Sequence, residues 1–329
     1  MVAALVLNSP GAEKSAAAKD VTVEKTDYKG WRNNLKIGNG DAELIVTLDV
    51  GPRVISYKLA DGANVFKNYD EMMGKTGENE WMIRGGHRLW VAPEDPERTY
   101  ALDNDMVEYK ELGPGRVKFT PKAEAAFGIR KEMEVTLSVS GSQVLVKHKV
   151  TNLGKKETVL AVWALSVMAP GGVEIIPLPP KSPHPGAAKN AKSAEDFAPD
   201  QFFSVWPFFD FKDPRWDFGT DFITLTQDAK RGATKLGLAH KSGRVGYLNA
   251  GTLFTKSFVF RKGRHYPDHG VNYETFTNED MLEMESLGPL TTLSPGDSVE
   301  HLEHWELFGN VGTAKTPAEI KERVAPHLK

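Results

Sequence analysis

Short segments in which apolar and polar residues alternate run through most of this chain after about residue 21. In KEMEVTLSVS, the apolar residues Met133, Val135, Leu137 and Val139 fall on one face of an extended chain and the polar residues on the other. A strand with one buried face requires this period of two. Glycine, asparagine, aspartate and proline separate the segments, as turns separate strands. The alternation therefore predicts an all-β protein of many short antiparallel strands, in a large sandwich or barrel.

Helix signals are few. The clearest lies in TPAEIKERVAPHLK near the C-terminus, where Thr316 can cap a helix, Pro317 fits its first turn and Glu319 takes the capping-box position. A second short helix is expected within residues 193–203. The sequence thus predicts a β protein with few helices, one of them near the C-terminus.

Residues 177–201 are rich in proline, alanine and lysine and show no strand pattern. A loop of that length inside a compact domain is usually a lid or a disordered connection. Strand-like sequence of the same character lies on both sides of it. We therefore expect residues 21–329 to form a single β-sandwich domain rather than two domains joined at this loop.

Residues 1–20 differ from the rest of the chain. Their apolar stretch, residues 2–7, is short and no basic residue precedes it, but the small-residue tract SAAAKD resembles sequence around a cleavage site. We expect a disordered start or the remnant of an export signal. A periplasmic or secreted protein is the favoured interpretation, and a cytoplasmic protein with a disordered start is the alternative.

Composition removes several classes of function. The chain has 41 basic and 44 acidic residues and a net charge of −3, which gives no basis for a nucleic-acid partner. It has no cysteine, so disulfides, thiolate zinc sites and cysteine nucleophiles are excluded. No apolar run approaches the roughly 18 residues of a membrane span, so no membrane partner is expected. Motifs for phosphate, dinucleotide, zinc-protease and serine-hydrolase sites are missing.

A first candidate site is RGGHRLWVAPE, residues 84–94. Its two glycines would let backbone approach a ligand or adopt positive φ. His87 can exchange a proton near neutral pH, and Arg88 offers a planar fork to hydroxyls or a carboxylate. Trp90 can stack on a sugar ring, although packing in the core is the commoner use of such a residue. The alternative interpretation is a turn that holds a hydrogen-bonded histidine.

A second candidate site lies in residues 265–290. In a strand over residues 281–287, Glu283 and Glu285 share one face. Two neighbouring carboxylates repel each other unless they are solvated, paired with a cation or separated in pKa by their surroundings. The apolar flanks make solvation of both unfavourable. This pair is therefore a candidate for acid–base chemistry.

Further polar residues precede that strand. His269, Asn272 and Glu274 are candidates for substrate binding. Asp268, Asn272, Glu274 and Glu283 form an all-oxygen set of the type that holds Ca²⁺. No loop with a recognised ligand spacing is present, so we expect no metal and no cofactor, with Ca²⁺ as an open alternative.

A third candidate site is FFSVWPFFDFKDPRWDFG, residues 202–219, which is dense in aromatic residues. Aromatic faces beside acidic and basic groups are typical of carbohydrate recognition. Trp206, Asp210 and Arg215 are the candidate sugar-binding residues here. The alternative is a hydrophobic plug that closes one end of a sandwich.

Three stretches together resemble one known superfamily. They are DVGPRVISYKLADGANVF (49–66), VTNLGKKETVLAVWALSVMAPGG (150–172) and MLEMESLGPLTTLSPGDSVEHLEHWEL (281–307). They are similar to the opening strands, the central strand and the closing stretch of galactose mutarotase-like (aldose 1-epimerase-like) proteins. GGHRLWVAPE and YETFTNEDMLEMESLGPL are most similar to a bacterial branch of that superfamily. The resemblance covers roughly residues 25–310.

The resemblance implies an antiparallel β-supersandwich with a sugar-binding cleft across one sheet. It also implies a glutamate as base on the anomeric hydroxyl and a histidine as acid on the ring oxygen. Glu285 occupies the place of that glutamate, and Glu283 is the fallback. The family's histidine lies on the central strand, where AVWALSVMAP has none. His87 is then the first candidate for the acid and His269 the second, so His87 and Glu285 are expected to face each other across one cleft.

The resemblance favours an isomerase that interconverts the anomers of a free sugar or sugar acid. The missing histidine and the aromatic stretch leave two alternatives open. One is a carbohydrate-binding module without catalysis, and the other is a polysaccharide lyase or hydrolase on the same fold. A carbohydrate ligand is expected in each case. The oligomeric state is left open.

Overall fold

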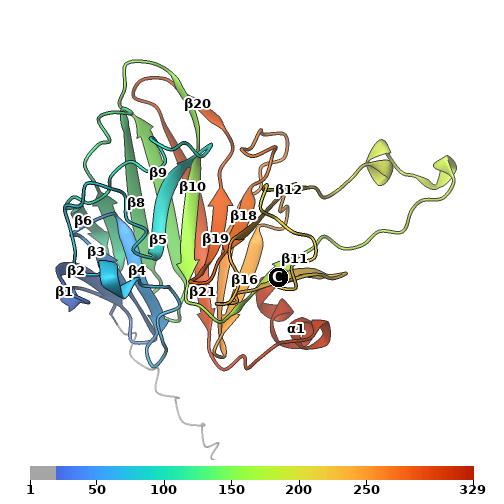
Figure 1. The fold of residues 1–329 in the computed structure, drawn as a ribbon, viewed down its shortest axis with the longest axis horizontal. Coiled ribbons are helices and arrows are strands. Elements are labelled where there is room, and N and C mark those ends of the chain that lie inside the picture. Colours follow the sequence, from blue (N-terminus) through green and yellow to red (C-terminus); the bar gives the residue numbers. More distant parts are fainter. Residues whose placement is uncertain (1–19) are drawn as a thin grey trace, which may run out of the picture.

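The computed structural model describes residues 20–329, which fold into two large sheets packed face to face, with all paired strands antiparallel (Figure 1). The first sheet contains, in spatial order, β1 (Thr22–Tyr28), β2 (Trp31–Gly38), β3 (Ala42–Thr47), β4 (Arg53–Leu59), β5 (Gly86–Ala92), β10 (Thr158–Met168), β19 (Leu282–Leu287), β18 (Tyr273–Thr277), β15 (Thr234–Leu238) and β12 (Phe203–Val205), and β20 (Thr291–Leu293) pairs with β10. The second contains β13 (Trp216–Phe218), β14 (Phe222–Thr226), β11 (Val173–Pro177), β16 (Arg244–Asn249), β17 (Thr252–Phe258), β21 (Ser298–Phe308), β9 (Val144–Asn152), β8 (Ile129–Leu137), β7 (Arg116–Thr120) and β6 (Glu108–Gly113). The predicted all-β sandwich is confirmed.

One α-helix is present in the described part of the chain, α1 (Pro317–Arg323), and it begins as predicted, with Thr316 as N-cap and Glu319 closing a capping box. It packs on the outer face of the second sheet through Ile320. Four 3₁₀ helices complete the helical content of that part, at Asp70–Met72, Ala188–Asn190, Ala194–Phe197 and Ala325–Leu328. None of the described helices is long and apolar enough to cross a membrane. The expectation for the N-terminus falls on residues 1–19, which lie outside the described residues.

The core lies between the two sheets and is filled by the inward face of each strand. Along β8, Met133, Val135 and Leu137 are buried while Glu134 is only half-buried, as the alternation predicts. The strand ends at Leu137, however, and Val139 lies beyond it, 62% exposed. Val139 lies in the turn between β8 and β9, so the period of two continues in the sequence past the end of the strand.

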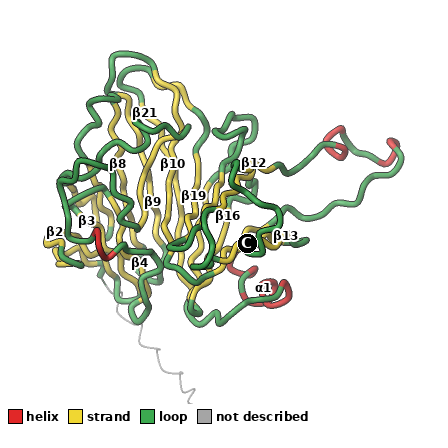
Figure 2. Tube along the Cα trace, in the orientation of Figure 1, coloured by secondary structure: helices red, strands yellow, loops and turns green. Residues whose placement is uncertain are grey.

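Residues 178–202, which we call the arm, connect β11 of the second sheet to β12 of the first. They carry two of the 3₁₀ helices and no strand, and they project far from the two sheets (Figures 1 and 2). Most of residues 181–200 are exposed. The short helix expected near residue 195 is confirmed as a 3₁₀ helix with a capping box at Ser193.

A network of polar side chains crosses the core between the sheets. His87 Nε2 lies 2.7 Å from His148 Nε2, and His87 Nδ1 lies 2.9 Å from Ser166 Oγ. His148 Nδ1 donates to the carbonyl of His301 at 3.2 Å, so its Nε2 is free to accept from His87. The two sheets are thereby joined by hydrogen bonds as well as by apolar contact.

The same network contains a buried ion pair. Lys256 Nζ lies 2.9 Å from Glu303 Oε1 and also donates to the carbonyl of Met284 at 2.9 Å. Trp305 Nε1 donates to the other carboxylate oxygen of Glu303 at 2.8 Å. Ser286 Oγ lies within hydrogen-bond distance of both Glu303 and His301. Each charge in this part of the core therefore has a partner, as burial requires.

Burial controls the protonation of the core histidines, and this gives a first prediction. It lowers the pKa of His148 and His301 to about 3, that of His240 to about 4 and that of His87 well below its usual range. We expect these four of the nine histidines to remain neutral at about pH 5, where exposed histidines, with a pKa near 6.5, are protonated. Nitrogen-15 NMR of the imidazole rings at a series of pH values measures this directly.

The same shifts have a consequence for stability. Below about pH 6.5 the unfolded chain binds protons on these histidines that the folded chain does not bind. Their contribution to the free energy of unfolding therefore falls as the pH drops, by roughly 1.4 kcal/mol per pH unit for each histidine. Titration of all nine imidazoles between about pH 6 and 7 would contradict the buried network.

Candidate functional site

The outer face of the first sheet carries charged side chains at its centre. In the strand register, Glu285 of β19 lies opposite Leu165 of β10 on one side and Glu274 of β18 on the other. Residues that alternate with these, such as Met284 and Tyr273, fill the core, so the charged ones point outward. The outer-face cluster consists of Arg88, Lys235, Glu274, Glu283 and Glu285, all less than 9% exposed.

Lys235 on β15 joins two of the carboxylates. Its Nζ lies 2.7 Å from Glu274 Oε2 and 3.2 Å from Glu285 Oε2. The ammonium group also lies 4.8 Å from the ring centroid of Trp163 and 4.6 Å from that of Trp206. Trp163 Nε1 donates to Glu285 Oε2 at 2.9 Å. The carboxylate of Glu285 is thus held by two donors from neighbouring strands, in an aromatic surrounding.

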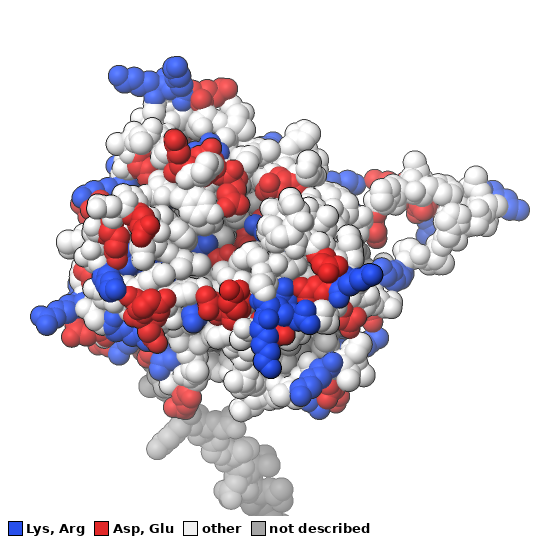
Figure 3. All heavy atoms as spheres, in the orientation of Figure 1, with Lys and Arg blue, Asp and Glu red and all other residues white. Residues whose placement is uncertain are grey.

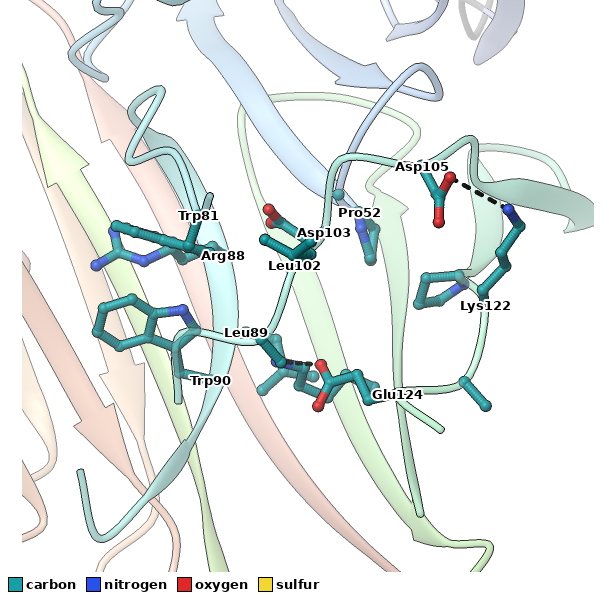
Figure 4. A pocket seen from close by; sticks show the side chains of 15 residues that line it. Pro52, Trp81, Arg88, Leu89, Trp90, Leu102, Asp103, Asp105, Lys122 and Glu124 are labelled. Carbon is teal, nitrogen blue, oxygen red and sulfur yellow. Dashed lines mark ion pairs between the residues drawn. The ribbon is translucent and has the colours of Figure 1, made fainter. Parts of the chain in front are cut away.

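Arg88 holds the third carboxylate. Its Nη2 lies 2.9 Å from Glu283 Oε1, and its guanidinium carbon lies 4.2 Å from the ring centroid of Trp90 and 5.2 Å from that of Trp81. Figure 4 shows the arginine beside the two indole rings, whose own centroids lie 4.9 Å apart. These three residues border a cavity of about 120 Å³, enough for about four water molecules. On the same side of the molecule, Figure 3 shows a hollow over β10 and β19 with charged atoms on its floor.

The charges of the cluster do not balance when all groups are ionised. Three carboxylates face two cations, so one carboxyl must gain a proton or remain uncompensated in a buried site. Burial raises the pKa of Glu285 to about 7, against the attraction of Lys235, and it raises the pKa of Glu274 well above its usual range. Burial alone would lower the pKa of Lys235, but Glu285 and Glu274 outweigh it and raise that pKa. Burial and the charge imbalance therefore both favour a protonated carboxyl at Glu274 or Glu285.

Several polar atoms of the cluster are buried and have no hydrogen-bond partner among the described residues. The acceptors include Oε1 of Glu274 and Oε1 of Glu285, and the donors are Nε and Nη1 of Arg88 and Nε1 of Trp81. Buried polar groups are usually paired, with ordered water or with a ligand where the protein itself supplies no partner. A polyhydroxylated ligand, whose hydroxyls both donate and accept, matches the mixture.

His87 does not face Glu285, which corrects the expectation that the two lie across one cleft. Its neighbour Arg88 points outward, and successive residues of a strand point to opposite faces. His87 therefore points into the core, where it is fully buried and contacts Ser166 and His148. It belongs to the network between the sheets and not to the outer-face cluster.

The glycine pair before His87 has a structural role, because it lets the backbone pass close to neighbouring segments. Gly85 and Gly86 have φ angles of +88° and +73°, a region that favours glycine. A Cβ atom on Gly85 would lie 2.0 Å from the carbonyl oxygen of Lys67, and one on Gly86 would lie 2.5 Å from that of Val54. The pair thus allows β5 to approach neighbouring chain closely and brings Arg88 into register.

Of the other residues predicted for the site, some lie at the outer-face cluster and some do not. Trp206 and Trp90 lie at the outer-face cluster with Glu274, Glu283 and Glu285. Asn272 instead bridges the backbone amide and carbonyl of His240, and His269 is exposed on the loop before β18. In the aromatic stretch, Asp210 is exposed in a turn and accepts from the amide of Lys212, while Arg215 forms a two-pronged pair with Asp213. Asp210 and Arg215 therefore lie apart from the outer-face cluster.

One set of side chains in the core has a geometry that a metal could use. One ligand atom each from His87, His148 and Glu303 lies within 4.8 Å of the others, and all three residues are buried. The two imidazole nitrogens are at hydrogen-bond distance, 2.7 Å, and Lys256 already neutralises Glu303. A divalent ion would add two uncompensated charges there, so we interpret the set as a hydrogen-bonded network.

Comparison with solved structures identifies the fold. A galactose mutarotase-like protein from Lactobacillus casei has a TM-score of 0.53 and 13% identity, over 84% of this chain and 100% of the other. A candidate aldose 1-epimerase from Escherichia coli K12 has a TM-score of 0.53 and 11% identity, over 88% and 99%. A galactose mutarotase-like protein from Clostridium acetobutylicum has a TM-score of 0.52 and 11% identity, over 88% and 99%. The chain has the galactose mutarotase-like fold.

Sequence comparison adds no closer assignment, since no family model and no curated protein matches the chain. At this level of identity the structural likeness shows the fold alone. Within the mutarotase-like fold, the strand on which the sequence resemblance implied a histidine is β10. Its outward residue beside Glu285 is Trp163, which donates one hydrogen bond and cannot exchange a proton.

Sequence reasoning missed Lys235 of the outer-face cluster and two tryptophans that contact the cluster, Trp163 and Trp81. Lys235 had a signal, because it stands in the strand TKLGL, all of which is buried, and a buried lysine needs a carboxylate partner. Trp163 was visible as an aromatic residue on the central strand. Trp81 lies outside any strand, and only the folded chain places it against Arg88.

Replacement of Lys235 tests the cluster. Lys235→Met would leave Glu274 and Glu285 buried without a cation, which costs roughly 3–5 kcal/mol of the free energy of unfolding. The cost should be greater at about pH 8 than at about pH 5, because protonation of the carboxyls removes the charge. Urea titration at both pH values measures it.

The matched control is Lys262→Met, whose side chain is 87% exposed. It should change stability by less than about 0.5 kcal/mol. Equal effects of the two replacements, or a Lys235→Met loss that does not depend on pH, would contradict the described role of Lys235.

Proposed function

We propose that this protein binds a sugar at the outer-face cluster and interconverts its anomers, as an aldose 1-epimerase-like isomerase. The observation that carries the proposal is the pair Glu274 and Glu285, buried side by side and bridged by Lys235. Environments that raise the pKa values of two neighbouring carboxyls toward neutral pH are typical of acid–base sites. The fold and the free donors and acceptors around Arg88 support it.

In this mechanism Glu285 is the base and Glu274 the acid. Ionised Glu285 takes the proton of the anomeric hydroxyl while protonated Glu274 gives its proton to the ring oxygen. The bond between C1 and the ring oxygen breaks, leaving the open-chain aldehyde, and C1–C2 rotates before closure. Closure returns both protons, so no net proton is consumed. Lys235 contacts both carboxylates and compensates whichever is ionised, and the steps use no cofactor.

The charges favour an uncharged sugar over a sugar acid. Arg88 is paired with Glu283, and Lys235 with Glu274 and Glu285, so neither cation is free for a ligand carboxylate. A further negative charge would enter a site that already holds three carboxylates. The open-chain intermediate of a neutral aldose adds no charge. We therefore propose a neutral free sugar as the ligand.

A binding module without catalysis is the second candidate. Trp163 and Lys235 already occupy Oε2 of Glu285, and Trp163 stands on the strand where the sequence resemblance implied the acid. In that case Arg88 and the indoles of Trp81 and Trp90 would hold a sugar that leaves unchanged. Binding without faster anomer exchange distinguishes this candidate from the isomerase.

Anomer exchange provides the direct test. Purified protein should accelerate the mutarotation of at least one freshly dissolved neutral aldose, followed by polarimetry or proton NMR. Glu285→Gln should lower the rate by roughly 10²–10⁴-fold, the usual contribution of one acid or base. Because the base must be ionised, the rate should fall as the pH drops below the pKa of Glu285, about 7.

Glu108→Gln, an exposed change on β6, is the matched control and should leave the rate unchanged. A rate equal to that of buffer across a broad panel of aldoses would contradict the isomerase. If calorimetry still detected binding of those sugars, the binding module would be the better assignment.

Ligand charge provides a separate test. Glucuronate should bind at least about 10-fold more weakly than glucose, because of repulsion by the buried carboxylates. Glu283→Gln frees Arg88 from its partner and should narrow that difference, whereas the exposed change Glu300→Gln should not. Calorimetric titration of both sugars measures the ratio. Tighter binding of glucuronate to the unaltered protein would contradict the charge argument.

A further inference from the structure

Both sheets end at the same side of the molecule, beside the base of the arm. There β12 is the last strand of the first sheet and β13 the last strand of the second, and neither has a further neighbour among the described strands. The ring centroids of Phe203 on β12 and Phe218 on β13 lie 6.4 Å apart, so the two edges meet. Unpaired strand edges are sites at which another chain can add.

Apolar side chains are concentrated at this end. The side chain of Phe211 is 75% exposed, although its ring contacts Phe209. The other apolar side chains of this end are between 44% and 47% exposed. Monomeric proteins rarely leave such a patch uncovered. We call the following residues the aromatic patch: Phe203, Val205, Phe208, Phe211 and Phe218, each between 44% and 75% exposed.

The arm ends at β12, beside the aromatic patch, and it projects away from the patch (Figure 1). Its ordered turns carry Phe197, which is 51% exposed, and it touches the sheets by few polar contacts, such as the exposed ion pair of Glu195 with Lys262 at 3.2 Å. A connection of 25 residues is far longer than two strands need. A long segment that makes so few contacts with the rest of its own chain fits a role in contact with another chain.

Charge indicates which chain the arm contacts. Residues 178–192 of the arm carry three lysines and no acidic residue, whereas residues 193–202 carry three acidic residues and no basic one. The rim of the aromatic patch exposes Asp210, Asp217 and Asp221 beside two lysines, Lys212 and Lys321, and Lys321 lies 3.9 Å from Asp221. The basic half of the arm therefore complements Asp210 and Asp217 on the rim of an identical molecule.

We propose that the protein forms a dimer in which each arm lies across the aromatic patch of a second copy. The contact is isologous, since each copy gives an arm and receives one. It covers the edges of β12 and β13 and the aromatic patch. It also borders the outer-face cluster, because Trp206, which contacts Lys235, directly follows β12.

Cysteine cross-linking tests the contact, because the chain contains no cysteine of its own. One preparation carries Ala188→Cys in the arm and the other carries Asp217→Cys at the patch. After mixing and brief treatment with a bismaleimide, a covalent dimer of one copy of each should form. The pair Ala188→Cys with Glu108→Cys, at the far end of the second sheet, is the matched control and should give at least about 10-fold less product.

Light scattering provides the second measurement. The unaltered protein should have about twice the chain mass of 36.3 kDa at micromolar concentration, and Phe203→Ser with Phe211→Ser should weaken the dimer at least about 10-fold. A monomer up to about 100 µM would overturn the proposal. A third preparation carries both Ala188→Cys and Asp217→Cys in one chain. Cross-linking only within these single chains would also overturn the proposal, because it would mean that the arm folds onto its own patch. The dimer proposal would also be overturned if the protein were a monomer whose patch variants lose affinity for an oligosaccharide. The aromatic patch would then be a binding surface for that oligosaccharide.

Discussion

The arrangement at the centre of the first sheet depends on one ammonium group, that of Lys235. It lies between Glu274 and Glu285 on strands that would otherwise place two carboxylates side by side in a buried position. Without it, the register of β18 against β19 would bring like charges into direct opposition, which destabilises a sheet. The indoles of Trp163 and Trp206 exclude water from the same group and strengthen each interaction. Folding of the sheet and the proposed chemistry at its surface therefore depend on the same cation.

The same strands carry a second polar set on their opposite face. On β19, Glu283 and Glu285 point outward while Ser286 joins the network of His301 and Glu303 in the core. The two sets differ in how many of their polar atoms have a hydrogen-bond or ion-pair partner. The core network pairs its charges internally, whereas the outer set leaves donors and acceptors without partners among the described residues. This difference, rather than the presence of charge, separates the structural set from the candidate site.

Much of the fold could be predicted from the sequence, because burial of one strand face imposes a period of two that is visible in KEMEVTL and in MLEMESL. Glu283 and Glu285 were found for the same reason, as two carboxylates on one face of a predicted strand. His87 was expected at the cleft because the resemblance implied a histidine that the central strand lacks. It cannot share a face with its strand neighbour Arg88, and because Arg88 points outward, His87 lies in the core. Lys235 and Trp81 reach the cluster only through pairing between distant segments, which local pattern does not encode.

One further property follows from how β4 meets β5. These neighbours are in register at a single pair, Val54 with His87, so the wide sheet consists of a ribbon from β1 to β4 and a ribbon from β5 to β12 joined at a narrow seam. Sheets accumulate twist of roughly 20–25° from strand to strand, and a seam relieves the strain of so many strands. The cavity beside Arg88 and Trp90 lies at this seam. Few ladder hydrogen bonds therefore join the two ribbons beside this cavity, and the buried Arg53 of β4 takes over part of their role by donating to the carbonyls of Met82 and Ile83, just before β5.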